Sequence, residues 1–459
     1  MEEITTPGSD TIVAPATAPG QAALAVLRLS GPQAIAIADT LWRGKSLAQA
    51  DSHTAHLGTV LDSRGLQLDQ AVAVVYRAPR SFTGQDSVEL TVHGSMYVRR
   101  ELLDTLIKAG ARLAEPGEFT RRAFLGGRLD LSQAEAVADI IAADSRAAND
   151  IAQSQLQGKF AGRIQQLRQQ LIDIASLLEL ELDFAEEDLE FADRTLLTQL
   201  ATQARDEIKR LLQSFRTGDA IMRGIPVAIV GAPNAGKSSL LNALLGHDRA
   251  IVSDVPGTTR DTIEETLHLG DHLFRFIDTA GLRASTDAVE RIGIDRARAA
   301  IASARIILYV HDATLPLHPD LIPRVPDATT LLVLNKTDLI PTPTLDSQLS
   351  TLDSQLLPTP LSTRTGEGLD QIVRHLVTIA ADMTTTYGDV LVANARHAEA
   401  LSSALTSIGR VLDGLRSTLP ADLVAQSLRE TISHLGAITG AIPSDLLLST
   451  IFSRFCIGK

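Results

Sequence analysis

Short hydrophobic runs separated by turn residues characterise the first quarter of the chain. Runs rich in apolar residues, such as Ala22–Leu29, Ala71–Tyr76 and Val88–Val92, alternate with clusters of Gly, Pro and Ser. A helical spacing of apolar residues follows over Met96–Ala109. Strands and turns combined with a helix predict an α+β domain over residues 1–125.

Helical periodicity dominates the next segment, over residues 132–213. Apolar residues recur there at spacings of three and four, which places them on one stripe of a helix: Phe160, Ile164, Leu167, Leu171, Ile174 and Leu178. After residue 389 the helical pattern returns and continues to about residue 434. These two helical segments flank a region of different character.

That middle region, residues 225–383, repeats a strand, a Gly-rich turn and a helix, which predicts an α/β domain with a mostly parallel sheet. The simplest architecture inserts this domain into a discontinuous α-helical domain whose two segments pack together. We therefore expect four segments. They are the α+β domain over 1–125, a first helical part over 126–222, the α/β domain over 223–383, and a second helical part with the C-terminal tail over 384–459.

A phosphate-binding loop begins the α/β region. The strand expected at Ile225–Val230 leads into Gly231-Ala-Pro-Asn-Ala-Gly236-Lys237-Ser238 and then a helical run, so the G-x-x-x-x-G-K-S pattern has its required context. Glycines allow backbone N–H groups to converge on phosphates at a helix N-terminus. Lys237 is expected to reach the outer phosphates, and the Ser238 hydroxyl to bind Mg²⁺.

Two further motifs follow in the order that a GTPase requires. Thr258 and Thr259 stand where a switch loop closes a threonine over Mg²⁺ and the γ-phosphate. Asp278-Thr-Ala-Gly281 follows the strand expected at Leu273–Ile277, so its carboxylate lies near the metal and its glycine can bend toward the γ-phosphate. The next residue is Leu282, where many small GTPases carry the glutamine that orients water. This chain must therefore orient its water by other means.

Guanine specificity is predicted from Asn335-Lys-Thr-Asp338, after the strand expected at Thr330–Leu334. The carboxylate can accept hydrogen bonds from N1–H and the exocyclic amine of guanine, and adenine offers no such pair of donors. All the motifs in order at strand ends predict a GTPase between about residues 231 and 365. The expected nucleotide-binding residues are Asn234, Ala235, Gly236, Lys237, Ser238, Ser239, Ser253, Asp254, Val255, Pro256, Gly257, Thr258, Thr259, Asp278, Thr279, Ala280, Gly281, Asn335, Lys336, Asp338, Ser362, Thr363 and Arg364.

Composition narrows the setting of this activity. A chain of 459 residues is expected to form two or three domains. A formal net charge of −13 and only 3% aromatic residues argue against a general nucleic-acid coat, so any nucleic-acid contact must be local or belong to a partner. The one cysteine, Cys456, excludes a disulfide framework and fits a reducing cytosol. We expect a cytoplasmic protein, since neither a signal-peptide pattern nor an uninterrupted apolar run of about 18 residues is seen.

Seven segments carry a family likeness: Asp10-Thr-Ile-Val-Ala14, Leu27-Arg-Leu-Ser-Gly31, Ser81-Phe-Thr-Gly84, Pro116-Gly-Glu-Phe-Thr120, Arg128-Leu-Asp-Leu-Ser-Gln-Ala-Glu-Ala136, Gly231–Ser239 and Phe455-Cys-Ile-Gly-Lys459. Over essentially its whole length the chain resembles the tRNA modification GTPase family MnmE, also called TrmE. The resemblance implies a GTP hydrolase that helps to place an aminomethyl or carboxymethylaminomethyl group on C5 of the wobble uridine of certain tRNAs.

The resemblance also implies an ion-dependent catalytic site. Lys237 and Glu290 would be catalytic, with Glu290 matching the carboxylate that orients water. Mg²⁺ would be held by Ser238 and Thr259, and K⁺ by Asn234, Ser253, Val255 and Thr258, where Ser253 and Val255 contribute backbone carbonyls. From the residues alone, Asn234 is equally well explained as a filler of the loop. Glu290 is then better explained as a first-turn residue stabilised by the helix dipole.

A folate pocket in the N-terminal domain is a third implication of the resemblance. The one-carbon donor would be a tetrahydrofolate derivative, 5-formyl or 5,10-methylene, contacted by Arg28, Glu89, Arg128 and Lys459. Arg128 stands where some members carry lysine, which keeps the charge but changes the geometry. Without the family, Arg28 is a strand-end surface charge and Glu89 an edge-strand residue. The C-terminal tail with Cys456 is implied to fold back toward this pocket and to support modification, chemically or by packing.

The implied partners are tRNA and the flavoprotein MnmG, which carries the FAD. The family also implies a homodimer through the N-terminal domain and a transient dimer of GTPase domains in K⁺. Two other functions stay open at this point: a ribosome-assembly GTPase, which should carry a basic RNA module that we do not find, and a regulatory GTPase with a conformational output. The basic pairs Arg99–Arg100 and Arg121–Arg122 are interpreted as ordinary surface charge.

Overall fold

The computed structural model describes residues 9–183, 194–247, 251–252, 264–278, 300–341, 357–385, 390–417, 419–441, 445–453, 455 and 458. The chain divides into two compact units, each made of more than one stretch of sequence. The first comprises residues 1–141, 155–169 and 432–459, and the second comprises residues 142–154 and 170–431. The division into four segments proposed from the sequence stays a prediction.

A seven-stranded sheet with the order β3-β4-β5-β6-β2-β1-β7 forms the frame of the first unit. All neighbouring strands are antiparallel except β1 and β7. Of the predicted hydrophobic runs, Ala71–Tyr76 and Val88–Val92 lie within β5 and β6, and Ala22–Leu29 begins two residues before β2. The strands are β1 (Ile12–Pro15), β2 (Leu24–Ser30), β3 (Trp42–Arg43), β4 (Thr54–Leu61), β5 (Gln67–Tyr76), β6 (Ser87–His93) and β7 (Arg112–Leu113).

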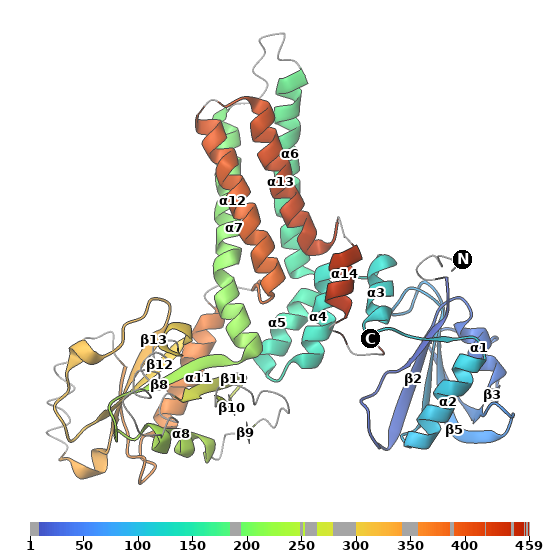
Figure 1. The fold of residues 1–459 in the computed structure, drawn as a ribbon, viewed down its shortest axis with the longest axis horizontal. Coiled ribbons are helices and arrows are strands. Elements are labelled where there is room, and N and C mark those ends of the chain that lie inside the picture. Colours follow the sequence, from blue (N-terminus) through green and yellow to red (C-terminus); the bar gives the residue numbers. More distant parts are fainter. Residues whose placement is uncertain are drawn as a thin grey trace, which may run out of the picture. The chain divides into compact units, whose positions relative to one another are not determined.

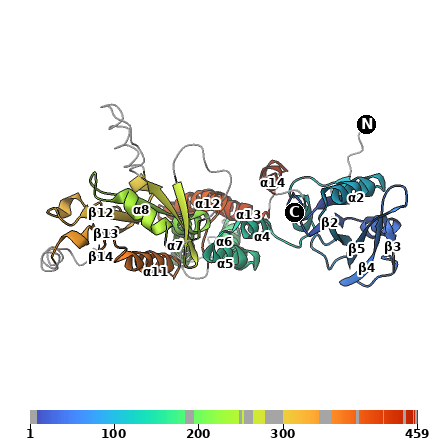
Figure 2. The same cartoon turned by 90° about the horizontal axis from the view of Figure 1, so that it is seen from below.

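The two faces of this sheet differ in character because side chains alternate along each strand. Leu27, Leu29 and Leu90 are buried in one core with α1 (Ala34–Thr40) and α2 (Met96–Lys108), and α2 confirms the predicted helix. Figure 2 shows α2 lying over the sheet. Arg28 lies between Leu27 and Leu29 in β2, and Glu89 precedes Leu90 in β6. Both side chains consequently lie on the opposite face of the sheet.

The first unit also contains residues 155–169 and 432–441, most of which belong to longer helices given below, and three further helices. They are α3 (Glu118–Leu125), α4 (Leu131–Ala142, which reaches one residue beyond the unit) and α14 (Asp445–Phe452). Leu131, Leu448, Phe452 and Phe455 form a buried cluster between them. A Cβ on Gly117, at the start of α3, would lie 2.7 Å from the carbonyl oxygen of Phe452. The C-terminal segment therefore packs closely against the N-terminal part of the same unit.

The second unit contains a seven-stranded sheet with the order β14-β13-β12-β8-β11-β10-β9. β14, β13, β12, β8 and β11 are parallel, and β10 and β9 are antiparallel to their neighbours. The predicted mostly parallel α/β domain is confirmed. The strands are β8 (Ile225–Val230), β9 (Ile251–Val252), β10 (Glu264–Leu269), β11 (His272–Asp278), β12 (Ile306–Asp312), β13 (Thr329–Asn335) and β14 (Leu357–Pro360).

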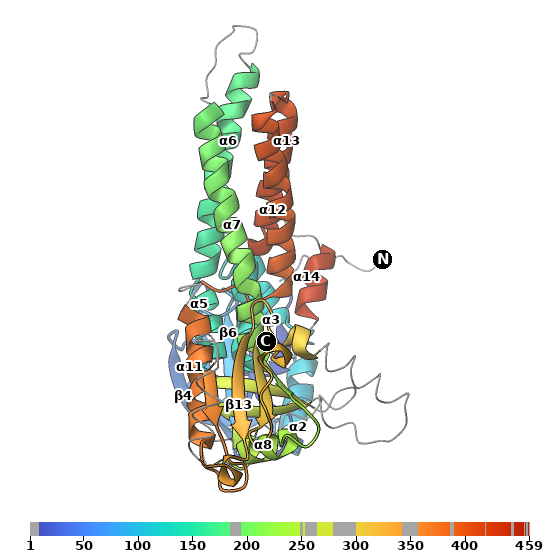
Figure 3. The same cartoon turned by 90° about the vertical axis from the view of Figure 1, so that its left-hand side faces the viewer.

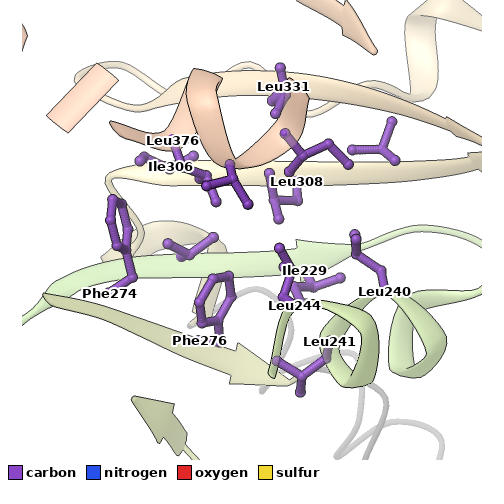
Figure 4. Packing of buried hydrophobic residues seen from close by; sticks show 14 of the residues in the cluster. Ile229, Leu240, Leu241, Leu244, Phe274, Phe276, Ile306, Leu308, Leu331 and Leu376 are labelled. Carbon is purple, nitrogen blue, oxygen red and sulfur yellow. The ribbon is translucent and has the colours of Figure 1, made fainter. Parts of the chain in front are cut away.

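Two helices, α8 (Lys237–Leu245) and α11 (Leu369–Thr385), bury their apolar sides on one face of this sheet. Figure 4 shows Leu240, Leu241 and Leu244 of α8 directed toward Ile229 and Phe276 on the strands. Two short 3₁₀ helices, Pro319–Leu321 and Thr337–Leu339, lie in the connections. The core thus packs β8 and α8 together and positions the loop between them.

Long helices precede and follow this sheet in sequence. They are α5 (Arg146–Leu156), α6 (Lys159–Asp183), α7 (Arg194–Arg223), α12 (Ala395–Arg416) and α13 (Ala421–Thr439). Of these, α6 and α13 each extend from one compact unit into the other. α7 and α12 lie side by side (Figures 1 and 3), and the Val392 N–H donates to Ser214 Oγ at 3.1 Å. Since the sheet lies between these helices in sequence, the predicted insertion is confirmed. The apolar stripe predicted on α6 is buried at every position. Among the helices in the described ranges, none is long and apolar enough to cross a membrane.

Candidate functional site

The phosphate-binding loop connects β8 to α8 at the carboxyl end of the central strand. Asn234 and Gly236 adopt left-handed φ angles of 62° and 101°, and Gly236 is the N-cap of α8. The Lys237 ammonium donates hydrogen bonds to the carbonyl oxygens of Gly231 at 2.9 Å and Ala232 at 2.8 Å. The cation therefore lies along the loop, beside a helix N-terminus that favours negative charge.

Close neighbours require glycine at two positions of this loop. A Cβ on Gly231 would lie 2.1 Å from the carbonyl oxygen of Val310, and one on Gly236 would lie 2.1 Å from Nδ2 of Asn335. Both glycines also have positive φ angles, which other residues rarely adopt. The spacing of glycines in the sequence motif thus reflects two close contacts as well as room for phosphates.

Asn335 ties the phosphate loop to the expected base-binding loops. Its side chain is buried, with Nδ2 donating to the carbonyl oxygen of Ala235 at 2.9 Å. Its Oδ1 accepts a hydrogen bond from the Thr363 N–H at 3.2 Å. One amide therefore holds three sequence motifs together, which makes Asn335 a positioning residue for the whole site.

The carboxylate of Asp338 is held in a fixed orientation beside these loops. Oδ1 accepts a hydrogen bond from Ser362 Oγ at 2.8 Å, and Oδ2 lies 3.1 Å from Nε of Arg364. The Asp338 side chain is 13% exposed, whereas Arg364 is 76% exposed. Because each carboxylate oxygen has about two lone-pair directions, these contacts leave acceptor capacity for a base edge.

Asp312 belongs to this site, and the sequence interpretation missed it. It ends β12, next to Asn335 in the register of β13, and its Oδ2 lies 2.5 Å from Nζ of Lys336. Burial alone would raise the pKa of Asp312, but hydrogen bonds from Lys336 and Thr314 lower it below its ordinary value. The pair fixes Lys336, which has a left-handed φ of 66°. The sequence did contain a signal for Asp312: it is an aspartate at the end of a strand, where the other nucleotide-binding motifs also lie.

The remaining predicted nucleotide and ion residues are only partly described. Ser238 and Ser239 are exposed in the first turn of α8, next to the loop. Asp278 ends β11 opposite Ile229 of β8, at the same sheet edge, although its side chain is outside the described set. Also outside the described residues are Ser253, Asp254, Val255, Pro256, Gly257, Thr258, Thr259, Thr279, Ala280, Gly281 and Glu290.

A second candidate site lies on the face of the first sheet opposite α1 and α2. Arg28 and Glu89 are paired across β2 and β6, with Nη2 to Oε1 at 2.7 Å and Nε to Oε1 at 2.9 Å. Tyr76 Oη donates to Glu89 Oε2 at 3.4 Å, and burial together with the Glu89 charge raises the pKa of Tyr76. Both charged side chains are about four-fifths covered, at 21% and 24% exposure. The structure therefore brings two predicted folate residues together.

Two aromatic rings lie beside this pair. The Arg28 guanidinium lies 5.6 Å from the ring centre of Phe82 and 5.8 Å from that of Phe119, both missed as site residues. Arg128 packs on the Phe82 loop, since a Cβ on Gly84 would lie 3.2 Å from its Cγ.

The tail reaches the same sheet. A Cβ on Gly458 would lie 2.1 Å from the carbonyl oxygen of Pro15, which pairs with Leu27 beside Arg28. The predicted tail residues Cys456 and Lys459 lie outside the described residues.

Arg122 corrects one sequence interpretation, because it is a buried member of an ion network and not surface charge. Its side chain is 5% exposed and lies 2.6 Å from Asp10 and 2.9 Å from Glu118. Arg112 contacts the same two carboxylates at 2.7 and 2.6 Å. Burial would raise the pKa of Glu118, but hydrogen bonds from Arg112, the Glu115 N–H and Arg122 lower it. Removing the Arg122 side chain would leave the Glu118 carboxylate buried without one of its partners, a change that costs about 3–5 kcal/mol at sites of this kind.

Comparisons with known proteins agree with this layout. One matching family model is described as the MnmE helical domain and covers residues 131–456, and another is described as the GTP-binding protein TrmE N-terminus and covers residues 11–128. A protein of Parabacteroides distasonis named tRNA modification GTPase MnmE is 44% identical over 98% of this chain and 100% of its own length. A protein of Cytophaga hutchinsonii with the same name is 45% identical over 98% of each. The solved G domain of the Thermotoga maritima FeoB iron transporter is 26% identical, over 34% of this chain and 98% of its own, with a TM-score of 0.25.

Proposed function

The chain belongs to the MnmE family of tRNA modification GTPases, and on this premise we propose that it hydrolyses GTP to GDP and phosphate in support of modification at C5 of the tRNA wobble uridine. The observation that carries the proposal is the Asp338 carboxylate, oriented by Ser362 and Arg364 beside a phosphate loop. A match over nearly the full length favours this function over a ribosome-assembly or regulatory GTPase.

In this proposal each described group of the nucleotide site has one task. Asp338 accepts the two N–H donors of guanine, and Asn335 keeps the base loop in register with the phosphate loop. Lys237 exchanges its contacts with the loop carbonyls for the outer phosphate oxygens. The N-terminus of α8 adds its dipole to the same negative charge.

Two ions fit the residues around the phosphate loop. The exposed Ser238 hydroxyl, with Thr259, suits Mg²⁺, and the exposed amide of Asn234, with Ser253, Val255 and Thr258, suits K⁺. When bound, these cations offset the negative charge that develops on the phosphates. Glu290 then orients the attacking water, because Leu282 stands where other GTPases have glutamine. The family resemblance supports these switch-loop roles.

A tetrahydrofolate derivative, 5-formyl or 5,10-methylene, fits the face of the first sheet opposite α1 and α2. Glu89 offers acceptors to the N–H donors of a heterocycle, while Phe82 and Phe119 offer flat apolar contacts beside Arg28. Arg128 and Lys459 would pair with the anionic end of the molecule. The folate supplies a one-carbon unit, and the chain's own residues bind and orient it.

The proposed partners follow the family. They are tRNA, the flavoprotein MnmG with its FAD, and a second copy of this chain, joined through the N-terminal domain and transiently through the GTPase domains. A cytoplasmic location fits the single cysteine.

One reconstitution tests the proposal. GTP turnover and wobble-uridine modification are measured with the purified chain, the flavoprotein, a folate donor and tRNA, in K⁺ and in Na⁺ at equal ionic strength. Turnover should be much faster in K⁺, and modification should require both proteins and GTP. Equal turnover in the two salts would remove the K⁺ role. Absence of modified uridine from the complete mixture, with GTP hydrolysed normally, would refute the tRNA function.

A further inference from the structure

A cavity of about 250 Å³ lies at the edge of the second sheet opposite the nucleotide site. It is formed where the end of α7 meets the beginnings of β8 and β12, with Gly224, Pro226 and Arg305 in its lining. The phosphate loop follows the other end of β8, at Gly231. A nucleotide held by that loop therefore does not occupy this cavity.

Arginine dominates the charged lining of the cavity. Four arginines face two aspartates there: Arg216, Arg223, Arg275 and Arg305 against Asp219 and Asp327. Arg216 pairs with Asp327 at 2.9 Å and Arg223 with Asp219 at 2.7 Å. Each aspartate thus has an arginine partner, and the lining as a whole has four arginines to two aspartates. A concave surface with more cations than anions concentrates negative ions, so the cavity favours an anion.

The two ion pairs leave their arginines available to such an anion. Arg216 and Asp327 are 64% and 61% exposed, and Arg223 is 69% exposed. Exposed pairs of this kind contribute little to stability because water and salt screen them. Arg305 is different, since its Nη2 donates to Thr217 Oγ1 at 3.1 Å and fixes the guanidinium in the wall. The cavity therefore combines a fixed cation with two that can change partner.

A row of cations on α7 continues from the cavity along the helix. Arg205, Lys209, Arg216 and Arg223 are separated by four and seven residues, spacings that return to nearly the same side of a helix. The row is about 27 Å long at 1.5 Å per residue. A small anion fills only the cavity, whereas an extended polyanion also meets the row. Arg205 pairs with Asp206 at 2.7 Å, a partly exposed contact that a phosphate can replace, as at Arg216 and Arg223. In a chain with a net charge of −13, these cations on one side of α7 favour a polyanionic partner.

We propose that the cavity and the α7 row bind backbone phosphates of tRNA, with one phosphate seated in the cavity. The inference rests on the proposed function, which makes tRNA the macromolecule concerned. A guanidinium group matches the geometry of a phosphate and can donate two parallel hydrogen bonds to two of its oxygens. Phosphate contacts carry no base information, so this surface orients the tRNA and leaves recognition of the wobble uridine to another part of the assembly.

The test compares two double variants of the full chain. Arg216→Gln with Arg223→Gln removes two cavity cations. Arg410→Gln with Arg429→Gln is the matched control, because these arginines are 55% and 62% exposed, form ion pairs with Glu430 and Glu179, and do not line the cavity. Binding of an unmodified tRNA transcript is measured across a range of salt concentrations. GTP turnover, which should be unchanged in both variants, shows that the fold is intact.

The cavity variant should bind tRNA about tenfold more weakly at 0.1 M salt, with a salt dependence shallower by about one to two in the slope of log affinity. The control should stay within about twofold of the wild type. Equal loss in both variants, or no loss in the cavity variant, overturns the proposal while leaving the tRNA function intact. Wild-type protein that binds no tRNA overturns both. Inorganic phosphate could also stabilise the wild type, but not the cavity variant, against heat while tRNA binding stays unchanged. That result assigns a small-anion site to the cavity and also overturns the proposal.

Discussion

Replacing Asp338 by asparagine should convert the nucleotide specificity of the GTPase. The carboxylate is 13% exposed and oriented by Ser362 Oγ at 2.8 Å, so the new amide will occupy the same position. Its NH₂ group is a donor where guanine also presents a donor. The partner Arg364 is 76% exposed, and its pairing contributes little to folding. We therefore expect a change in binding without a loss of structure.

The magnitude follows from the two hydrogen bonds that the carboxylate offers to guanine. A hydrogen bond to a charged group contributes about 1.5–3 kcal/mol, and the variant loses one and weakens the other. A total of about 4 kcal/mol corresponds to a GTP affinity roughly a thousandfold lower. Xanthosine triphosphate carries a carbonyl oxygen in place of the exocyclic amine, so the side-chain amide introduced by Asp338→Asn can donate to it. The affinity of the variant for xanthosine triphosphate should rise as its affinity for GTP falls.

Equilibrium binding of both triphosphates to the wild type and the variant measures this exchange. Ser362→Ala is the matched control, because it removes the hydrogen bond that orients Asp338 but leaves the carboxylate in place. That loss of about 1 kcal/mol should weaken GTP by less than tenfold and should not favour the xanthine nucleotide. If Asp338→Asn retains the wild-type affinity for GTP, the base contact assigned to Asp338 is wrong.

Two further predictions concern catalysis and stability. Glu290→Ala should lower kcat by about a hundredfold or more while the Kd of GTP stays nearly constant, since Glu290 acts on water. Turnover assays measure kcat and equilibrium binding measures Kd. A large loss of GTP affinity would contradict this role. Burial, and next the charge of Glu135, raise the pKa of Asp139 from 3.8 to about 6. The folded state therefore keeps a proton that the unfolded chain releases, and stability falls as pH rises from about 4 to about 6. Asp139→Asn should remove that slope and raise the free energy of unfolding at pH 7 by about 3 kcal/mol at most. Hydrogen exchange of α4 measures it, and an unchanged slope would count against a buried, neutralised carboxyl.

The elements predicted from the sequence are those in which hydrophobic periodicity is long or burial is complete. β8 is buried at every position, and the stripe on α6 repeats over about five turns, so both produce a strong local pattern. The two-residue strands β3 and β7 are too short to have a period. α1 has seven residues and no side-chain N-cap, so no start signal precedes it.

The candidate sites likewise contain some residues that the sequence predicts and others that it does not. The nucleotide motifs are contiguous, and their chemistry requires particular residues at fixed spacing, so their positions were predicted. The Arg28–Glu89 pair joins residues 61 apart, and Arg122 reaches Asp10 across 112 residues. Only the sheet register of β2 and β6 and the packing of α3 bring these groups together. Periodicity and composition contain no information about either contact, which is why the burial of Arg122 was missed.

The tail offers a test that separates the two activities proposed for this chain. Phe455 packs in the cluster around α3 and α14, and Gly458 lies against Pro15, next to the strand that carries Arg28. Cys456 stands between these two anchored residues in sequence, and the phosphate loop belongs to the other compact unit. Cys456→Ser should therefore leave GTP turnover unchanged and abolish most wobble-uridine modification, with Cys456→Ala distinguishing a chemical role from a packing role. Both activities are measured in one preparation. Normal modification by the serine variant would show that the thiol is dispensable, because serine keeps the size of the side chain and removes only its sulfur chemistry and part of its apolar contact.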